Sequence, residues 1–238
     1  MKKVITINVD VTKLAKLSDL NGSLGERVYA AIKGAILSLD FSPGAVIRKK
    51  EICEWFDISR SPVSDALTKL ASEDLVDIVP QSGTRVSRLS MTDIREFAFL
   101  REALEVAAVR HAAISRSEEV LARLMRNIEM QKLLVLDADK DDFFKSDAQF
   151  HREIMLTTNN VRLPTTVKAL SSHLDRARIL LVPEPQRLAE TVEEHIAIVE
   201  AIKHKNMDMA QKAMAEHLQQ LIRRLEPLEK DRPDLFSS

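Results

Sequence analysis

The chain has 238 residues, 45% of them hydrophobic and only five of them glycine, which is typical of compact, helix-rich globular proteins and excludes a disordered chain. No apolar run reaches the roughly 18 to 20 residues of a membrane span, and the single cysteine, Cys53, excludes a disulfide framework and a multi-thiolate zinc site. A net charge of −1 gives no overall attraction for nucleic acid, so any case for DNA binding depends on how the charges are arranged.

The length predicts two domains, and the absence of a secretory signal pattern at the first residues predicts a cytoplasmic protein with no membrane partner. Apolar side chains recur every four residues from Leu24 to Ile36, which predicts an amphipathic helix that ends at about Leu39. A second, short helix is expected over residues 50–56, and it would bury Ile52.

A third helix is predicted from about Pro62 to Glu73. Ser61 can accept hydrogen bonds from the free backbone N–H groups of the first turn, and Pro62 would occupy the first helical position, where its missing donor costs nothing. Its inner face includes Val63 and Leu67. The start of this helix is therefore well marked.

A β-hairpin is predicted next, because two short alternating segments, 76–79 and 84–87, flank a turn that contains Ser82 and Gly83. Three helices followed by a hairpin is the order of a winged helix-turn-helix, in which the third helix enters the major groove of DNA with its N-terminus first. The alternative is a small structural or protein-binding module with the same order of elements.

The residues that begin the third helix suit contacts to DNA. Arg60 can make a bidentate hydrogen bond to guanine, and Ser59 and Ser61 can donate to a base or a phosphate. Gly83 at the hairpin tip would let the backbone approach DNA closely. The basic run over residues 48–50 is a further candidate, although it could also be a solvated face.

Beyond Ser90 only long helices are predicted, and Asn206 can cap the last of them. The fold class is therefore mainly α, with an N-terminal winged helix-turn-helix and a C-terminal all-α helical bundle of about six helices. We expect the first 23 residues and the tail after Pro227 to be loosely held. The expected helices span residues 91–114, 117–136, 139–158, 164–182, 186–204 and 207–226. The expected domains are an N-terminal extension (1–23), the DNA-binding domain (24–89), an effector, metal-binding and dimerisation domain (90–228) and a C-terminal tail (229–238).

Four residues of the second domain could bind a metal ion. Asp147 and His151 are four residues apart, which places them on one helix face, and His195 and His217 lie in the middle of two later helices, where a core-facing imidazole needs a partner. If they converge, an Asp and three His suit a divalent ion such as Zn²⁺, Ni²⁺ or Mn²⁺ with open coordination positions. The alternative is that each histidine is a satisfied core or surface residue.

Residues 24–88 resemble the winged helix-turn-helix of the GntR family of bacterial regulators. The segment SRSPVSDALTKL is similar to the family signature Ser-Arg-(Ser/Thr)-Pro-Val-Arg-Glu-Ala-Leu, and a Gly-containing wing follows it. Ser64 stands where the family usually has a second DNA-contacting Arg, and Asp74 stands where a helix-ending Gly is usual. Asp tolerates the left-handed backbone that this Gly adopts. The resemblance implies DNA-contacting positions at Lys50, Ser59, Arg60, Ser61 and Gly83, with Ser64 as the departure.

The segment from about Met91 to Leu225 is similar to the ligand-binding FCD domain of the FadR subfamily, in FLREALE, DAQFH, EEH and a late AEHL. The resemblance implies a metal bound by the Asp and three His named above. It also implies an effector cavity beside the metal, in which a carboxylate completes the coordination shell and an Arg on the first helix neutralises it. Arg101 occupies that place, and Arg178 is a second candidate for contact with the effector.

The sequence therefore predicts a dimeric, ligand-responsive transcriptional repressor that binds a palindromic DNA operator and senses a small organic or sugar acid beside a divalent metal, with zinc as the first candidate. One alternative is a metal-sensing regulator without an organic effector. A metal-dependent hydrolase is the other, but Glu194 points about 100° away from His195 on a helix and no HExxH motif occurs, so we expect no enzyme.

Overall fold

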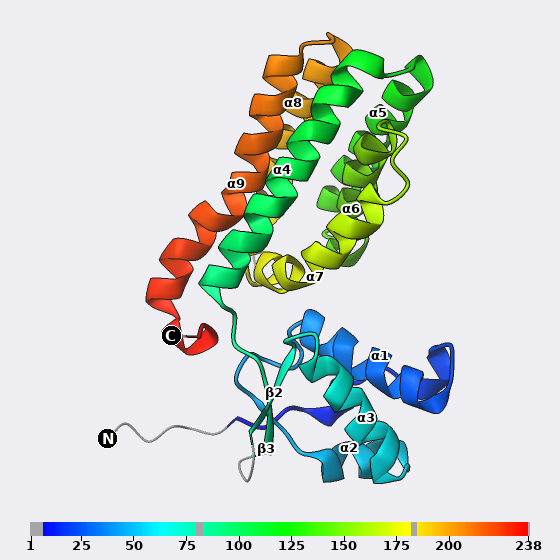
Figure 1. The fold of residues 1–238 in the computed structure, drawn as a ribbon, viewed down its shortest axis with the longest axis vertical. Coiled ribbons are helices and arrows are strands. Elements are labelled where there is room, and N and C mark those ends of the chain that lie inside the picture. The colour runs from blue at the N-terminus through cyan, green and yellow to red at the C-terminus, as the bar shows by residue number, and fades with distance from the viewer. Residues whose placement is uncertain (1–6, 80–82, 182–184, 238) are drawn as a thin grey trace. The chain divides into compact units, whose positions relative to one another are not determined.

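A computed structural model describes residues 7–79, 83–181 and 185–237 of the chain (Figure 1). The chain divides into two compact units. The first comprises the described residues of Met1–Met91 and Pro227–Ser238, and the second is Thr92–Glu226. Each unit is described by itself.

In its described part the first unit contains the α-helices α1, α2 and α3, three short 3-10 helices and a small antiparallel sheet with the strand order β1-β3-β2. The helices confirm the predicted winged helix-turn-helix, and the hairpin of β2 and β3 is in register from Val76 opposite Val86 to Val79 opposite Gly83. Ser82 of the predicted turn lies outside the described residues. The elements are α1 (Leu24–Leu37), β1 (Val46–Ile47), α2 (Lys49–Phe56), α3 (Arg60–Ala71), β2 (Val76–Val79) and β3 (Gly83–Val86).

Local chemistry explains where these helices begin and end. Ser23 and Glu26 form a capping box that starts α1, and Asp57, with φ of +52°, turns the chain between α2 and α3. Helix α3 begins at Arg60 rather than at Pro62, and its N-cap is Ser59, so the expected cap by Ser61 is wrong. Pro62 still lies in the first turn, where backbone N–H groups have no helical partner and a missing donor costs nothing.

The expectation of loosely held chain ends is wrong for the described residues. Val9 and Leu14 are buried against the first unit, and residue 8 bridges to β1. Helix α9 continues through Pro227 to Asp231, and after it Leu235 and Phe236 are buried. The tail adds a short bridge to Leu89, so its apolar side chains hold it in place.

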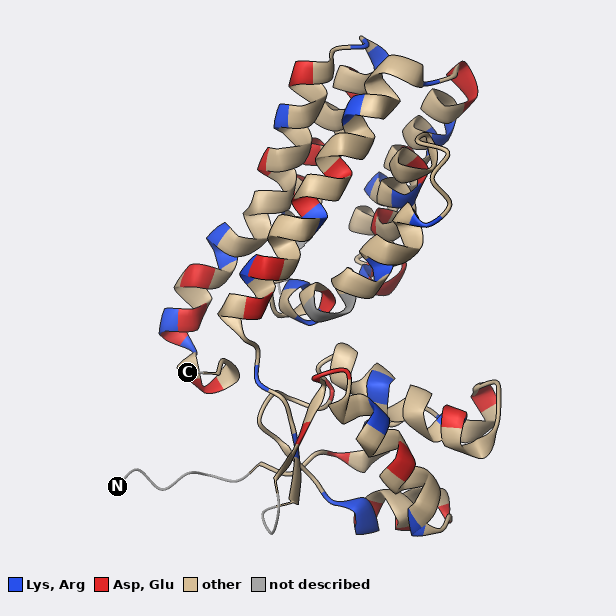
Figure 2. Cartoon of the chain, viewed as in Figure 1, with Lys and Arg blue, Asp and Glu red and all other residues tan. Residues whose placement is uncertain are grey.

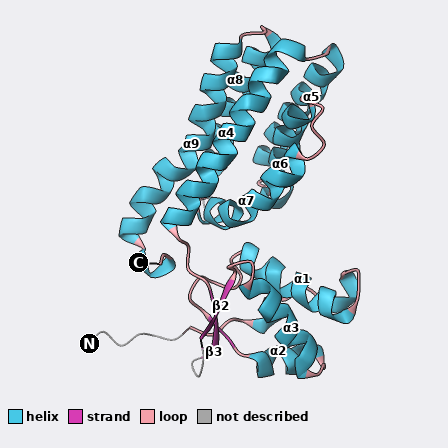
Figure 3. Ribbon diagram, in the orientation of Figure 1, coloured by secondary structure: helices cyan, strands magenta, loops and turns pink. Residues whose placement is uncertain are grey.

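The second unit is all helical in its described part, which confirms the predicted mainly α fold with about six C-terminal helices (Figure 3). Asn206 Oδ1 accepts from the backbone N–H of Met209 at 3.0 Å and so caps the last helix, as predicted. The helices are α4 (Met91–Ser115), α5 (Glu118–Leu136), α6 (Lys140–Leu156), α7 (Leu163–Leu180), α8 (Pro185–Lys203) and α9 (Met207–Asp231).

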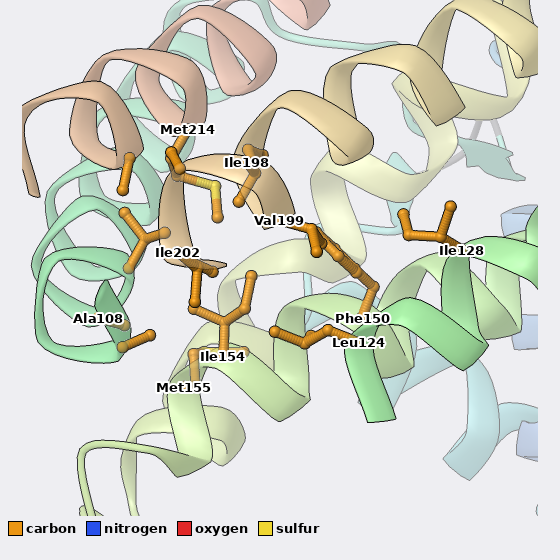
Figure 4. Close-up of a cluster of buried hydrophobic side chains, with 14 of the residues drawn as sticks. Ala108, Leu124, Ile128, Phe150, Ile154, Met155, Ile198, Val199, Ile202 and Met214 are labelled. Atoms are coloured by element: carbon orange, nitrogen blue, oxygen red, sulfur yellow. The ribbon is translucent and has the colours of Figure 1, made fainter. Parts of the chain in front are cut away.

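Apolar side chains from all six of these helices form the core of the second unit, and Figure 4 shows part of it. Leu124 of α5, Phe150 and Ile154 of α6, Ile198 of α8 and Met214 of α9 are each at most 1% exposed. This core fixes the faces that α6, α8 and α9 turn inward, and the polar cluster described below lies on those same faces. Among the described residues, no helix combines the length and the apolarity that crossing a membrane requires.

Candidate metal centre and nucleic-acid interface

The four side chains predicted as metal ligands lie together inside the second unit. Asp147 and His151 are one helical turn apart on α6, His195 lies on α8, and His217 lies on α9. All four are buried, and their candidate ligand atoms lie within 4.8 Å of one another. The packing of three helices therefore brings together residues that are distant in the chain.

The ligand atoms are spaced as a tetrahedral ion requires. Nε2 of His217 lies 3.2 Å from Nε2 of His151 and 3.4 Å from Nε2 of His195. Oδ1 of Asp147 lies 3.5 Å from Nε2 of His195 and 3.9 Å from Nε2 of His151. A tetrahedral ion with bonds of about 2.0 to 2.1 Å keeps its ligand atoms about 3.3 to 3.4 Å apart, so these side chains need only small shifts to bind one.

The other ring nitrogen of each histidine donates a hydrogen bond to a side-chain oxygen. With the proton held on Nδ1, each neutral ring directs the lone pair of Nε2 toward the other ligand atoms. Three lone pairs and a carboxylate oxygen that face one another repel unless a cation lies between them. The pairs are His151 with Glu105 (2.5 Å), His195 with Gln131 (2.8 Å) and His217 with Glu194 (2.6 Å).

The carboxylate of Asp147 is half satisfied. Its Oδ2 accepts from Arg178 at 2.6 Å, whereas its buried Oδ1 has no hydrogen-bond partner among the described residues. A buried, unpartnered carboxylate oxygen is costly, and a metal ion would remove that cost. Three imidazole nitrogens and one carboxylate oxygen are a donor set that Zn²⁺, Ni²⁺ and Mn²⁺ accept. The residues present therefore fit a divalent ion.

Burial and charge hold the ligands in the protonation states that metal binding needs. Desolvation holds the pKa of His195 and of His217 well below its usual value, and neighbouring histidines lower it further. Burial on its own would raise the pKa of Asp147, but Arg178 and the histidines outweigh it, and the pKa falls below its usual range. Near pH 7 these two imidazoles are neutral and the carboxylate is ionised.

The residues that orient the histidines were missed by the sequence analysis. Glu105 lies on α4 and is 1% exposed, and Gln131 lies on α5 and is fully buried. Burial alone would raise the pKa of Glu105, but the charges of Arg101 and His151 outweigh it and lower the pKa. Glu194 was considered only as a general base and instead pairs with His217. No local spacing links these residues to their histidines, because each partner comes from another helix.

A cavity of about 80 Å³ opens beside the cluster, and both Asp147 and His217 line it. The two predicted effector contacts, Arg101 and Arg178, line it as well. Nε of Arg101 donates to Glu105 at 2.5 Å, and Arg178 donates to Asp147 through one NH2 group. A guanidinium has five donors, so each arginine keeps further N–H groups for a ligand.

Two further arginines line the same cavity, and the sequence analysis did not select them. Arg187 forms no ion pair with any described residue, and Arg224 donates to Glu190 at 3.1 Å and lies 3.5 Å from Glu194. Four arginines outnumber the two acidic side chains of the lining, Asp147 and Glu194. The cavity therefore favours an anion small enough for its volume.

The predicted DNA contacts lie at the surface of the first unit. Ser59, Arg60 and Ser61 are exposed at the start of α3, and Lys50 is exposed on α2, within the basic segment that Figure 2 shows at the beginning of that helix. The helix N-terminus adds its own partial positive charge to this corner. Such a surface can contact phosphates and base edges.

The other two predicted DNA contacts, Ser64 and Gly83, differ in exposure. Ser64 is half-buried, and the ammonium of Lys49 lies 3.4 Å from its hydroxyl, so Lys49 reaches the place where a longer side chain is usual. Gly83 is exposed with φ of +95°, a backbone conformation that favours glycine, and among the described residues beyond its chain neighbours no atom lies within 4 Å of where a Cβ would stand. Asp74 has φ of +55°, in the left-handed region expected for it.

The sequence matches two known families. Residues 24–86 match the gntR family of bacterial regulatory proteins, and residues 96–220 match the FCD domain. The metal cluster and the cavity lie on helices of the second match, and all of the predicted DNA contacts lie within the first.

Proteins that align with this chain over most of its length are also transcriptional regulators. The HTH-type transcriptional repressor RspR of Escherichia coli strain K12 is 28% identical over 214 residues, which cover 90% of this chain and 94% of RspR. An HTH-type transcriptional regulator of Streptomyces ambofaciens is 31% identical over 223 residues, which cover 93% and 94%. The structure of Escherichia coli McbR/YncC, 23% identical, has a TM-score of 0.68 over 87% of this chain and 99% of that one, which shows a shared fold.

Proposed function

Because this chain belongs to the gntR family of bacterial regulatory proteins and carries an FCD domain, which fits the FadR subfamily, we propose that it represses transcription from a palindromic operator as a homodimer. The chain is a transcriptional regulator and not an enzyme. The name of its relative RspR, a repressor, supports the direction of regulation. The proposal assigns DNA recognition to residues 24–89 and sensing to residues 90–228.

The operator is read by the exposed start of α3. Arg60 contacts a guanine through its fork of donors, and Ser59 and Ser61 hold the neighbouring phosphates or bases. Lys50 and the backbone at Gly83 contact the DNA phosphates on either side of α3. Ser64 contributes less to DNA contact than the Arg that is usual at this position. Because a two-fold dimer presents two such helices, the half-sites of the operator are related by the same two-fold axis.

The sensing site binds a divalent ion through Asp147, His151, His195 and His217. When bound, the ion supplies positive charge and an open coordination position to which a carboxylate can bind. Zinc suits the tetrahedral spacing of the ligand atoms best, with nickel and manganese as the alternatives. The observation that carries the proposal is that every Nε2 faces the shared centre while every Nδ1 is held by an oxygen acceptor.

The effector is a small organic or sugar acid bound in the cavity beside this cluster. Arg101 and Arg178 neutralise its carboxylate with the N–H groups that they do not spend on Glu105 and Asp147. The volume of about 80 Å³ restricts the ligand to a compact one. Effector binding then lowers the affinity of the dimer for its operator, in proportion to the effector's preference for the released state.

The test combines metal analysis, native mass spectrometry and operator binding. About one metal ion per chain and a co-purified acid are expected, together with operator binding that the acid weakens. Operator binding that responds to metal and chelator alone, and to none of a panel of small acids, would favour a metal-sensing regulator. A purified chain with no metal and no acid would reduce the four ligands to structural polar residues and remove the sensing proposal.

A further inference from the structure

The cavity beside the metal ligands has arginines at the end that adjoins those ligands. Arg178 donates to Asp147, and Arg101 donates to Glu105, which in turn holds the ring of His151. The proposed function assigns these two arginines to the carboxylate of the effector. The lining of the cavity contains two more arginines, to which that function gives no role.

These two arginines, Arg187 on α8 and Arg224 on α9, belong to the other end of the cavity. Arg224 follows His217 by two helical turns, so its backbone lies about 10 Å farther along the same face of α9. Its guanidinium donates to Glu190 of α8 at 3.1 Å, and Arg187 precedes Glu190 by one turn on the surface of that helix. The two side chains therefore form a second basic end, which we call the distal arginine pair.

The distal arginine pair has hydrogen-bond donors to spare. Arg187 is half-buried and forms no ion pair with any described residue. Arg224 makes both of its acidic contacts, to Glu190 at 3.1 Å and to Glu194 at 3.5 Å, through one terminal nitrogen, so its other donors are open toward a ligand. A guanidinium fork matches the paired oxygens of a carboxylate or a phosphate. The distal end of the cavity is therefore suited to an acidic group.

The stretch between the two basic ends carries little free charge. Thr191 and Gln220 line it and offer a hydroxyl and an amide to a ligand. Glu194 is the acidic side chain of this stretch, and its two oxygens already contact His217 and Arg224. The middle of the cavity therefore suits the uncharged carbon chain of a ligand whose acidic groups lie at its ends.

We propose that the effector is a dianion, with one carboxylate beside Arg101 and Arg178 and a second acidic group, a carboxylate or a phosphate, on the distal arginine pair. The inference rests on the proposed function, because it requires the effector to occupy this cavity. It narrows the small organic or sugar acids to compact ones that carry an acidic group at each end. An acid with one carboxylate leaves the donors of Arg187 without an anion, so it binds more weakly.

The first experiment compares acids that differ only in the second acidic group. Succinate replaces the methyl group of butyrate with a carboxylate, and phosphoglycolate replaces the hydroxyl of glycolate with a phosphate. Isothermal titration calorimetry with the full-length, zinc-loaded chain measures the four dissociation constants. At least one diacid is expected to bind about tenfold or more tightly than its matched monoacid, because charge-assisted hydrogen bonds to a guanidinium are strong. The pair with the larger ratio identifies the second group as carboxylate or phosphate.

The second experiment repeats these titrations with variants of the two ends. Arg187→Gln is expected to weaken the diacid far more than its monoacid, so that the ratio falls to near one. Arg178→Gln is expected to weaken both members of a pair and to keep their ratio. The matched control Arg223→Gln removes an exposed charge of α9 next to Arg224 and should change neither constant. Circular dichroism verifies that each variant is folded.

The outcomes separate this inference from the proposed function. If no diacid binds more tightly than its matched monoacid, the inference is overturned, and monoacids that still bind leave the sensing proposal in place. A preference for the diacid that survives Arg187→Gln would place the second acidic group elsewhere and would also overturn the inference. A chain that binds neither metal nor any acid of either class would overturn the proposed sensing function and this inference with it.

Discussion

His195 connects the ligand cluster to the core around it. The side chain is fully buried, its ring stacks on Phe150 with centroids 4.2 Å apart, and its Nδ1 is held by Gln131. Removing this ring takes away one of four ligand atoms and leaves Gln131 without its partner. The metal affinity of the site therefore depends on this residue as much as on any other.

His195→Ala is expected to lower bound metal to well below one ion per chain, because only three ligand atoms remain and the ring that stacks on Phe150 is lost. Inductively coupled plasma mass spectrometry of the dialysed protein measures this content. The matched control is His204→Ala, which removes an exposed histidine near the end of the same helix and should leave the content unchanged. Equal metal content in both variants would remove His195 from the site.

Specific binding to the operator is expected to depend on Arg60 at the start of α3. Arg60→Ala is expected to abolish specific operator binding, with a loss of about 10- to 100-fold or more, because a bidentate contact to a base contributes roughly 1 to 3 kcal/mol. Fluorescence anisotropy with operator and scrambled DNA measures the loss, and light scattering should show an intact dimer. Lys145→Ala makes the same change of charge in the second unit and serves as control. Specificity that survives Arg60→Ala would mean that α3 is not the recognition helix.

At the scale of elements, a polar network holds the recognition helix against α1. The hydroxyl of Tyr29 donates to Glu73 at 2.6 Å, the ammonium of Lys33 donates to the same carboxylate at 2.7 Å, and the ammonium of Lys69 lies over the Tyr29 ring. Glu73 lies just beyond the end of α3, and both sides of its ion pair with Lys33 are less than a third exposed. The network therefore fixes the end of α3 opposite to the one that meets DNA.

Glu73→Gln is expected to lower the free energy of unfolding of the protein by about 1 kcal/mol, because two hydrogen bonds lose their charged acceptor. Burial alone would raise the pKa of Glu73, but the hydrogen bonds from Lys33 and Tyr29 lower it below its usual value of 4.5. The wild type is therefore more stable than Glu73→Gln above about pH 4.5, and this difference in the free energy of unfolding is lost as the pH falls through the lowered pKa of Glu73. Urea unfolding from pH 7 to pH 3.5 measures the difference between the two proteins, and a difference that stays constant would contradict the argument.

Element boundaries show where local sequence information ends. The four-residue periodicity from Leu24 to Ile36 was sufficient to place α1. The strand β1 has only two residues, Val46 and Ile47, which is too short for an alternating pattern, and it exists because β3 offers it hydrogen bonds. The start of α3 was placed two residues late because Pro62 is tolerated anywhere in the first turn, so its position does not identify the first residue.

At the scale of the whole molecule, the last residues of the chain belong to the unit that begins it. The backbone of Leu89 bonds to Leu235 and Ser237 at 3.0 and 2.8 Å, and Arg88 donates to the carbonyl of Asp234 at 2.9 Å. Leu235 and Phe236 are buried beside Leu89. The segment after α9 is therefore a structural part of the first unit.

Phe236→Ala is expected to lower the free energy of unfolding of the first unit by about 2 kcal/mol, the transfer free energy of one buried aromatic side chain. Thermal unfolding followed by circular dichroism measures the change, and limited proteolysis should show earlier cleavage after α9. The control Lys230→Ala changes an exposed side chain of α9 and should have little effect. Equal stability of the two variants would mean that the tail contributes no packing energy.

What the sequence by itself determined is local or carried by family motifs: the helix periods, the order of helices and hairpin, the pairing of Asp147 and His151 one turn apart, and the resemblance in SRSPVSDALTKL. These features depend on residues close in the chain, so a short window contains them. The tertiary structure decided that His195 and His217 meet that pair, that Glu105, Gln131 and Glu194 hold the rings, and that Phe236 packs beside Leu89. Each of these contacts joins segments far apart in the chain, and it depends on the burial of apolar faces by the whole unit, which no local pattern records.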